Sequence, residues 1–331
     1  MNYRTFGKPG WQVSEIGFGA WAIGGDMWGP QDDAESLKAL HKAADLGVNF
    51  FDTAQGYGKG HSEEVIGRFL KERSEELLVA TKVPARPGSP WPLPMNARCE
   101  DFFPASYVIG ECEKSLKRLG RETIDVYQFH TWNASLNGQD EWFEAMSSLK
   151  KQGKIRAIGV SVPDTDPESV IGGIALGRID SVQLVFNIFE QVPEWNVFPL
   201  AEKFGTAIIV RVPFDEGALT GKYSETTTFP ENDVRRRYFR GNNLKAVVRK
   251  VNEIAVFKDR RHSGMSMADY ALKFSLSQMA VSTVIPGMRS VRQVEMNCAA
   301  SNGESLSAEE LQGLKKFFWR KDFWHEEVKP G

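Results

Sequence analysis

The sequence predicts a closed (β/α)8 barrel, in which eight parallel strands alternate with helices. Two observations support this fold. Eight short apolar runs alternate with stretches of helical character, an alternation that suits a closed barrel better than an open doubly wound sheet. The chain has 331 residues and 41% hydrophobic content, enough to bury the large core of such a barrel, and residues 1–331 are expected to form a single domain.

The predicted elements follow one another in regular order after an N-terminal extension that precedes the first barrel strand. Asp32 and Asp33 stand where the first helix should begin and can cap its free amide groups. Ser307 and Glu310 can form a capping box, which predicts the start of the last helix. The strand and helix pairs are expected at 16–20 with 33–46, 49–52 with 62–71, 77–82 with 105–119, 123–130 with 140–151, 155–160 with 167–176, 181–186 with 193–204, 207–211 with a long insertion, and 281–285 with 291–300.

Two long loops interrupt this alternation, at 84–104 and at 214–240. The first contains Trp91, and the second ends in a basic run from Arg235 to Arg240. Long loops at the catalytic face of a barrel usually bind ligands. We therefore expect both loops beside the functional site, although the basic run also fits an ordinary solvated surface.

The composition indicates a protein that binds small molecules. Lys and Arg total 41 against 43 Asp and Glu, so neither nucleic acid nor an anionic membrane is expected as a partner. The N-terminal region has no apolar stretch of signal-peptide length and no membrane-span pattern follows, which predicts a soluble protein of the cytoplasm. Cys99, Cys112 and Cys298 lack the spacing of metal ligands, so we expect buried thiols, with no disulfide and no metal site.

Four polar residues stand at the ends of predicted strands or in the loops that follow them. Asp52, Lys82 and His130 each end an apolar run, and Tyr57 lies in a loop between two glycines. The C-terminal ends of barrel strands share one face, so these side chains can converge. Tyrosine has a pKa of about 10 and is a poor acid at neutral pH unless a cation stabilises its phenolate. Lys82 can supply that cation and Asp52 can hold the lysine, which points to the reduction of a carbonyl group.

The motifs around these residues resemble those of the aldo-keto reductase family. The matching segments are Phe51-Asp52-Thr53-Ala54 with Tyr57-Gly58, then Thr81-Lys82, then Gln128-Phe129-His130, and the runs 153–161, 217–222 and 285–289. The first three are similar to the family's catalytic tetrad in order and spacing, and the similarity covers nearly the whole chain. The resemblance implies a barrel that binds NADPH, with NADH less favoured, and that passes hydride to an aldehyde or ketone carbon.

The resemblance also implies catalytic roles. Tyr57 would protonate the carbonyl oxygen, and Lys82, paired with Asp52, would lower the pKa of Tyr57. His130 would orient the carbonyl and help to donate to the developing alkoxide, in a general-acid and electrostatic role. The nicotinamide would supply the hydride, and the protein would supply geometry and charge.

Cofactor contacts are implied by the same resemblance. Ser161 and Gln183 would hold the nicotinamide carboxamide, and Arg289 would favour NADPH, because a guanidinium can bind a 2′-phosphate through charge-assisted hydrogen bonds. The basic run could close over the same phosphate. The remaining expected cofactor contacts are Trp21, Arg211, Pro213, Phe214, Gly217, Lys222, Gly287, Gln293 and Asn297. Trp28, Trp91 and Trp132 are expected to contact substrate, with packing at the barrel rim as the alternative for each.

Three positions depart from the family pattern. Val162 stands where an asparagine is common, Met296 where a glutamate is common, and Arg211 where an aromatic residue usually stacks on the nicotinamide. The guanidinium of Arg211 could stack on the ring or bind a phosphate, and its charge could disfavour the cationic oxidised cofactor.

Three alternatives to a carbonyl reductase follow from the sequence. The run from Gly17 to Ala22 formally matches the dinucleotide fingerprint G-x-G-x-x-A, but the glycine-broken stretch after it does not predict the helix that a Rossmann fold requires. A cofactor-binding sensor or regulatory subunit with little turnover is a second alternative, which the intact Tyr57, Lys82 and His130 disfavour. The third is an alcohol or sugar dehydrogenase that runs in the oxidative direction.

Overall fold

The eight parallel strands close into a barrel. The computed structural model describes residues 1–329, and in this range the sheet has the order β10-β9-β8-β7-β6-β5-β4-β3, so that strands consecutive in sequence are neighbours. Isolated parallel bridges from Ile16 to Val284 and from Gly19 to Gly287 join the two edges of the sheet. The strands are β3 (Phe18–Gly19), β4 (Phe50–Asp52), β5 (Leu78–Val83), β6 (Ile124–Phe129), β7 (Ile155–Ser161), β8 (Ser181–Val185), β9 (Ala207–Arg211) and β10 (Val281–Val284).

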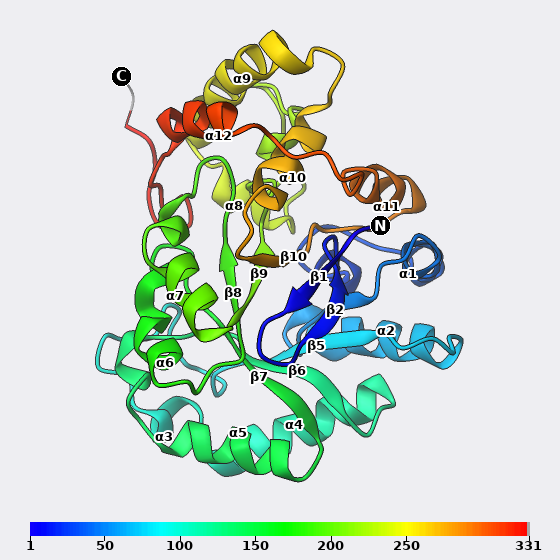
Figure 1. Cartoon of the computed structure of the whole chain (residues 1–331), viewed down its shortest axis with the longest axis vertical. Helices are drawn as coiled ribbons and strands as arrows, with labels where there is room; N and C mark the ends of the chain where they lie inside the picture. The colour runs from blue at the N-terminus through cyan, green and yellow to red at the C-terminus, as the bar shows by residue number, and fades with distance from the viewer. Residues whose placement is uncertain (330–331) are drawn as a thin grey trace.

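Helices follow every barrel strand and surround the sheet (Figure 1). All eight predicted strands are confirmed. The segment after β9, for which the sequence predicted only a long insertion, contains three α-helices and the short 3-10 helix η6 (Ala218–Thr220). The helices are α1 (Asp33–Asp45), α2 (His61–Lys71), α3 (Cys99–Phe102), α4 (Ala105–Leu119), α5 (Glu141–Lys151), α6 (Ile171–Ala175), α7 (Val197–Phe204), α8 (Val234–Tyr238), α9 (Asn243–His262), α10 (Met267–Leu276), α11 (Val291–Cys298) and α12 (Ala308–Leu314).

The predicted helix starts and the rejection of the Rossmann alternative are confirmed. Asp32 accepts a hydrogen bond from the Glu35 amide, and Ser307 and Glu310 form the complete capping box of α12. After Gly19 the chain enters only a short 3-10 helix, η1 (Ala22–Gly24), instead of the helix that a dinucleotide fingerprint opens. The consecutive strand order likewise differs from the reversed order of an open nucleotide-binding sheet.

Alternate residues of each strand point into the barrel. Along the barrel axis these inward residues change from apolar to polar. At the N-terminal ends of the strands Phe50, Leu78 and Val126 belong to one buried apolar cluster. Two residues after Phe50 comes Asp52, and two residues after Ala80 comes Lys82. The other polar residues in these inward positions are Gln128, Ser161, Gln183 and Arg211. A polar interior therefore opens at the C-terminal end of the barrel, where function was predicted.

The N-terminal extension is a hairpin of β1 (Tyr3–Phe6) and β2 (Trp11–Ser14) that closes the opposite end of the barrel. Its side chains Phe6 and Val13 are fully buried and belong to the same apolar cluster as the interior strand residues. In Figure 1 the hairpin, in dark blue, crosses the middle of the ring of helices. The apolar cluster thus continues from the strands into the hairpin.

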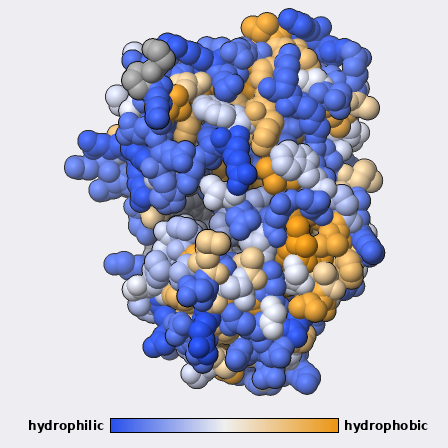
Figure 2. All heavy atoms as spheres, turned by 90° about the vertical axis from the view of Figure 1, so that its left-hand side faces the viewer, coloured by the Kyte–Doolittle hydropathy of each residue, from blue (hydrophilic) through white to orange (hydrophobic). Residues whose placement is uncertain are grey.

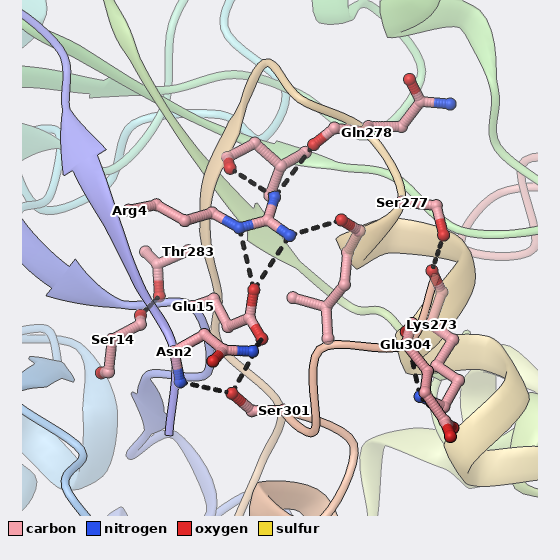
Figure 3. A network of polar contacts seen from close by, with 12 residues as sticks. Asn2, Arg4, Ser14, Glu15, Lys273, Ser277, Gln278, Thr283, Ser301 and Glu304 are labelled. Carbon is pink, nitrogen blue, oxygen red and sulfur yellow. Dashed lines mark hydrogen bonds and ion pairs between the residues drawn. The ribbon is translucent and has the colours of Figure 1, made fainter. Parts of the chain in front are cut away.

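A polar network fastens the hairpin to the end of the barrel sequence (Figure 3). Arg4 Nη1 donates to the carbonyls of Gln278 and Val281, each at 3.0 Å, and Arg4 Nε donates to Glu15 at 3.0 Å. Ser301 Oγ donates to the other oxygen of Glu15 at 2.7 Å. The hairpin is therefore held by residues on both sides of β10.

The surface seen in Figure 2 is largely hydrophilic, and hydrophobic residues gather in smaller patches on it. Within residues 1–329, no helix combines the length and the apolar character needed to cross a membrane. The three cysteines are buried and unpaired with one another, as predicted.

Candidate active site

Lys82 is the centre of the polar end of the barrel. Its Nζ donates to Asp52 Oδ2 at 2.7 Å, to the Thr53 carbonyl at 2.8 Å and to Tyr57 Oη at 3.2 Å. Lys82 is fully buried and Asp52 is 2% exposed. Burial acts to lower the pKa of Lys82, but the charge of Asp52 and the contact with Tyr57 outweigh it and raise that pKa. Lys82 is therefore a fixed cation beside the Tyr57 hydroxyl.

Asp52 is held from the opposite side by two amides. Gln183 Nε2 donates to Asp52 Oδ1 at 2.7 Å, and Gln128 Nε2 lies 3.4 Å from the same oxygen. Gly159 makes room for this arrangement, because a Cβ on Gly159 would lie 2.5 Å from Gln128 Cγ. The sequence suggested a carboxamide-binding role for Gln183 and none for Gln128. In the structure both amides point at Asp52.

Tyr57 begins the short 3-10 helix η2 (Tyr57–Gly60), which packs backbone to backbone on η1. A Cβ on Gly24 would lie 2.7 Å from the Gly58 nitrogen, and Gly58 itself has a positive φ of 63°. Only glycine fits both requirements without strain. The ring of Trp21, just before η1, stacks on Tyr57 with centroids 5.9 Å apart. Trp21 therefore lies beside the predicted proton donor.

Two opposing effects act on the pKa of Tyr57. Burial raises it, and the charge of Lys82 lowers it by a smaller amount, so the net pKa lies above the ordinary value of 10.0. The predicted lowering effect of Lys82 on the pKa of Tyr57 is present, and burial outweighs it. The hydroxyl consequently keeps its proton at neutral pH.

His130 is a neutral imidazole. Burial, together with the charges of Lys82 and Arg211, lowers its pKa to about 3. Its ring meets Tyr57 edge to face, with centroids 5.7 Å apart. A neutral imidazole can donate one N–H hydrogen bond but does not deliver a proton as an imidazolium. The structure therefore supports the orienting role predicted for His130 and disfavours the general-acid role.

The three tryptophans predicted to contact substrate have different environments. Trp91 is 61% exposed, and its ring centroid lies 6.2 Å from that of His130. Trp132 is fully buried, packs against Phe129 and Trp142, and donates to Asn137. The prediction that Trp132 contacts substrate is wrong, because its ring belongs to the core beneath the loop.

Trp28 belongs to a bridge between two loops, which we call the strap (residues 27–29 and 233–235). Trp28 pairs with Asp233, and the Val234 amide donates to the Met27 carbonyl at 2.9 Å. The guanidinium of Arg235 lies 4.8 Å from the Trp28 ring centroid, and Arg289 Nη1 donates to the Trp28 carbonyl at 2.6 Å. The strap thus brings the first barrel loop into contact with the basic run.

Three cationic side chains lie near one another at the strap: Lys222, Arg235 and Arg289. Burial, followed by the charges of Arg235 and Arg289, lowers the pKa of Lys222, and burial and Arg235 lower the pKa of Arg289. The carboxylate of Asp233 offsets part of this positive charge, since it accepts a pair of hydrogen bonds from Arg235. Mutual repulsion of this kind is relieved by an anion, so the three side chains fit the phosphates of a nucleotide.

The basic run divides between two places. Arg235 belongs to the strap, whereas Arg236 is exposed, and Arg237 and Arg240 donate to carbonyls of the C-terminal segment at Phe323 and Trp324. Only one of these arginines is thus joined to the cation cluster. From the sequence, all four arginines of the basic run were expected to close over the same phosphate.

The loop after β9 has an unusual backbone. Val212, Asp215 and Glu216 adopt φ values of 53°, 48° and 54°, which are uncommon for residues with a side chain. Asn187 Nδ2 supports Val212 by donating to its carbonyl at 2.9 Å. Strained backbone of this type is concentrated at ligand sites. Pro213, Phe214 and Gly217, which were predicted to contact the cofactor, lie in this loop.

The other predicted cofactor residues lie around the same end of the barrel. Ser161 ends β7 in register with Gln183 on β8. Gly287 forms the bridge to Gly19, and the Arg289 amide donates to Gln293 Oε1 at 2.8 Å. Asn297 is buried on α11, one turn beyond Gln293.

Arg211 has partners that the sequence did not indicate. Its Nη2 donates to the Val162 carbonyl at 3.0 Å and to Asp164 Oδ1 at 2.5 Å. Asp164 Oδ2 accepts from Trp324 Nε1 at 3.0 Å. Nearby, Lys321 Nζ donates to Asp215 at 2.5 Å. The C-terminal segment therefore reaches the active-site end of the barrel, a contact with no local sequence signal.

Comparisons with known proteins agree with this fold and site. The sequence model described as Aldo/keto reductase family matches residues 15–318. The chain is 32% identical over 318 residues to the aldo-keto reductase YhdN of Bacillus subtilis, which covers 95% of this chain and 92% of the relative. It is 28% identical to an NADH-specific methylglyoxal reductase of Escherichia coli, with 88% and 90% of the two chains covered.

A solved structure shows the same architecture. The glycerol dehydrogenase AKR11B4 from Gluconobacter oxydans is 32% identical, superposes with a TM-score of 0.78 and covers 96% of this chain and 94% of its own. The chain belongs to the aldo/keto reductase family. It is an NAD(P)H-dependent oxidoreductase with a (β/α)8 barrel.

Proposed function

We propose that this protein catalyses the NADPH-dependent, reversible reduction of an aldehyde or ketone to an alcohol, with Tyr57 as the proton donor. The observation that carries the proposal is the series of Asp52, Lys82 and Tyr57, in which the first two side chains are buried and Tyr57 is partly buried, joined by contacts of 2.7 and 3.2 Å. It supplies a neutral hydroxyl next to a fixed cation, which is what a proton donor to an alkoxide needs.

The bound substrate carbonyl accepts hydrogen bonds from Tyr57 Oη and from the neutral imidazole of His130. The cofactor supplies a hydride to the carbonyl carbon. As negative charge develops on the carbonyl oxygen, the Tyr57 proton moves to it, and Lys82 stabilises the phenolate that remains. Asp52 holds Lys82 in place throughout, because its two oxygens are bound by Lys82 and Gln183.

The pKa of Tyr57 supports the reductive direction. Burial keeps the hydroxyl protonated, so the donor is ready before the carbonyl binds. Oxidation of an alcohol requires the phenolate instead, which forms less readily while the pKa is raised. An oxidative role remains the second candidate, because one structural relative is named a glycerol dehydrogenase.

NADPH is the cofactor that the cation cluster favours. Lys222, Arg235 and Arg289 present three positive charges where NADH would supply only a diphosphate, and the additional 2′-phosphate of NADPH would neutralise more of them. In this proposal Ser161 contacts the carboxamide, residues 213–217 follow the diphosphate, and Gln293 and Asn297 contact the adenosine. Gly287 and Lys222 line the path between them.

Substrate would bind between the aromatic side chains at the open end. Trp21 stacks on Tyr57 and Trp91 stands exposed over His130, so both can pack on the apolar part of a small carbonyl compound. We assign Trp28 to the strap instead. The proposed setting is the cytoplasm, with a small molecule as the binding partner.

The test is NADPH oxidation by the purified protein with aromatic, aliphatic and sugar carbonyls, for the wild type and for Tyr57→Phe. We expect Tyr57→Phe to lower kcat/KM by about 100-fold or more, because general-acid catalysis contributes factors of about 10² to 10⁴. Tyr3→Phe is the matched control, since it removes a hydroxyl on the hairpin, remote from the site, that donates to the Gly47 carbonyl. Turnover that survives in Tyr57→Phe would refute the donor, and NADPH binding without turnover would favour the sensor alternative.

A further inference from the structure

Asp164 is fixed between a guanidinium and an indole. Its Oδ1 accepts from Arg211 Nη2 at 2.5 Å, and its Oδ2 accepts from Trp324 Nε1 at 3.0 Å. The indole is itself packed on Tyr238, with ring centroids 4.8 Å apart. The carboxylate therefore has a defined orientation, set by a residue 160 positions away in the sequence.

Arg211 and Asp164 are both charged. Burial opposes both charges, but the attraction and hydrogen bond between them outweigh it, so the pKa of Asp164 lies below its ordinary value and the pKa of Arg211 lies above. Two further groups act in the same directions: Lys321 lowers the pKa of Asp164, and Glu216 raises the pKa of Arg211. The field that Arg211 exerts on its surroundings is therefore partly cancelled by Asp164.

The field of Arg211 reaches the reacting groups. After burial and Lys82, the charge of Arg211 also contributes to the pKa of Tyr57 and of His130, and it lowers both. The buried Nε of Arg211 has no acceptor among residues 1–329. A nicotinamide close enough to reduce a carbonyl held by Tyr57 would therefore lie within the field of this guanidinium.

We propose that Asp164, positioned by Trp324, balances the charge of Arg211 and so sets the relative affinity of the site for oxidised and reduced cofactor. The inference rests on the proposed function, because it requires a nicotinamide beside Tyr57. The oxidised ring carries a positive charge that the reduced ring lacks. An uncompensated Arg211 weakens the binding of the oxidised form, and an uncompensated Asp164 strengthens it.

Replacing Asp164 and replacing Arg211 should change the relative affinity for the two cofactor forms in opposite directions. The measured quantity is the ratio of Kd for NADP⁺ to Kd for NADPH, obtained by titration calorimetry. We expect Asp164→Asn to raise this ratio by about tenfold and Arg211→Gln to lower it by a similar factor, the size of one partly screened charge interaction. The double variant should return the ratio towards that of the wild type.

Trp324→Phe tests the positioning role and serves if Asp164→Asn does not fold. It removes the indole N–H and keeps a ring against Tyr238, so a smaller rise in the ratio is expected. Asp322→Asn is the matched control, since it removes an acidic side chain that pairs with His325 on the same segment, and it should leave the ratio unchanged.

A shift of the same sign in Asp164→Asn and Arg211→Gln would overturn the inference, because a merely structural role changes both alike. So would an unchanged ratio in Asp164→Asn, or in Trp324→Phe should Asp164→Asn not fold. Failure of the wild type to bind either nucleotide would instead refute the proposed function itself.

Discussion

Gln183 and Asp52 are joined across the barrel interior by a hydrogen bond of 2.7 Å, from Gln183 Nε2 to Asp52 Oδ1. Gln183 lies in the middle of β8 and Asp52 at the end of β4, 131 positions apart in the sequence. The second oxygen of Asp52 binds Lys82 at 2.7 Å. The direction in which Lys82 faces Tyr57 therefore depends on β8 as well as on its own strand.

Replacing Gln183 with methionine should lower the free energy of unfolding. The change leaves a buried carboxylate oxygen with only the 3.4 Å contact from Gln128, at an expected cost of about 1–3 kcal/mol in urea denaturation. Gln12→Met is the control, because it removes an exposed hydrogen bond to Thr5 and should change stability by less than about 0.5 kcal/mol. Equal effects of the two substitutions would contradict the role of Gln183.

His130 should not titrate in the working pH range. Its pKa is lowered to about 3, so the imidazole is neutral from about pH 5 upward, and kcat/KM should show no His130 inflection between about pH 5 and 8. His130→Gln, which keeps an N–H donor, should retain more activity than His130→Phe. An inflection near pH 6.5 that disappears in His130→Gln would show that the histidine is protonated during turnover.

Glu216 should make the protein less stable as the pH rises. Burial, followed by the charges of Asp164 and Asp215, raises its pKa to about 8. The folded state then holds this proton more tightly than the unfolded state, so the contribution of Glu216 to stability falls between about pH 4.5 and 8. Glu216→Gln removes that titration, and its stability relative to the wild type should increase across this window by a few kcal/mol at most.

The Glu216 comparison needs urea denaturation at several pH values, with Glu225→Gln as the control, since Glu225 is exposed and pairs with Arg249. A difference between Glu216→Gln and the wild type that stays constant from about pH 5 to 8.5 would exclude a raised pKa for Glu216.

Arg235 and Arg236 should differ in their effect on nucleotide affinity. Arg235 lies in the strap with Trp28 and the cation cluster, whereas Arg236 is exposed. Arg235→Gln should raise the Kd for NADPH by about tenfold and weaken its salt dependence, because one charge-assisted contact is lost. Arg236→Gln should change Kd by less than about twofold. Similar losses in both variants would mean that the run acts only through its overall charge.

The strands and the convergence of Asp52 and Lys82 could be predicted because they obey local rules. Asp52 and Lys82 lie on inward positions of their strands, and the spacing of two residues from Phe50 and Ala80 is visible in the sequence. That one domain spans residues 1–331 stays a prediction.

The rest depended on contacts between distant segments. Trp132 follows a strand end as a substrate-binding residue would, and only the position of Trp142 shows that its ring is in the core. Arg211 pairs with Asp164, which in turn accepts from Trp324, and no local pattern links these residues. The effect of Lys82 on the pKa of Tyr57 could be predicted because its charge is visible in the sequence, whereas the larger effect of burial could not.

The barrel closes where its two edge strands, β3 and β10, meet, and this closure affects how the chain folds on the ribosome. The Val284 amide binds the Glu15 carbonyl at 2.9 Å, so residues made early are joined to residues made near the end of synthesis. Contacts of such large sequence separation form late and slow folding. Until β10 emerges, the β3 side of the sheet keeps an unpaired edge that can pair with another nascent chain. We therefore expect chains truncated before residue 281 to aggregate instead of forming a smaller barrel.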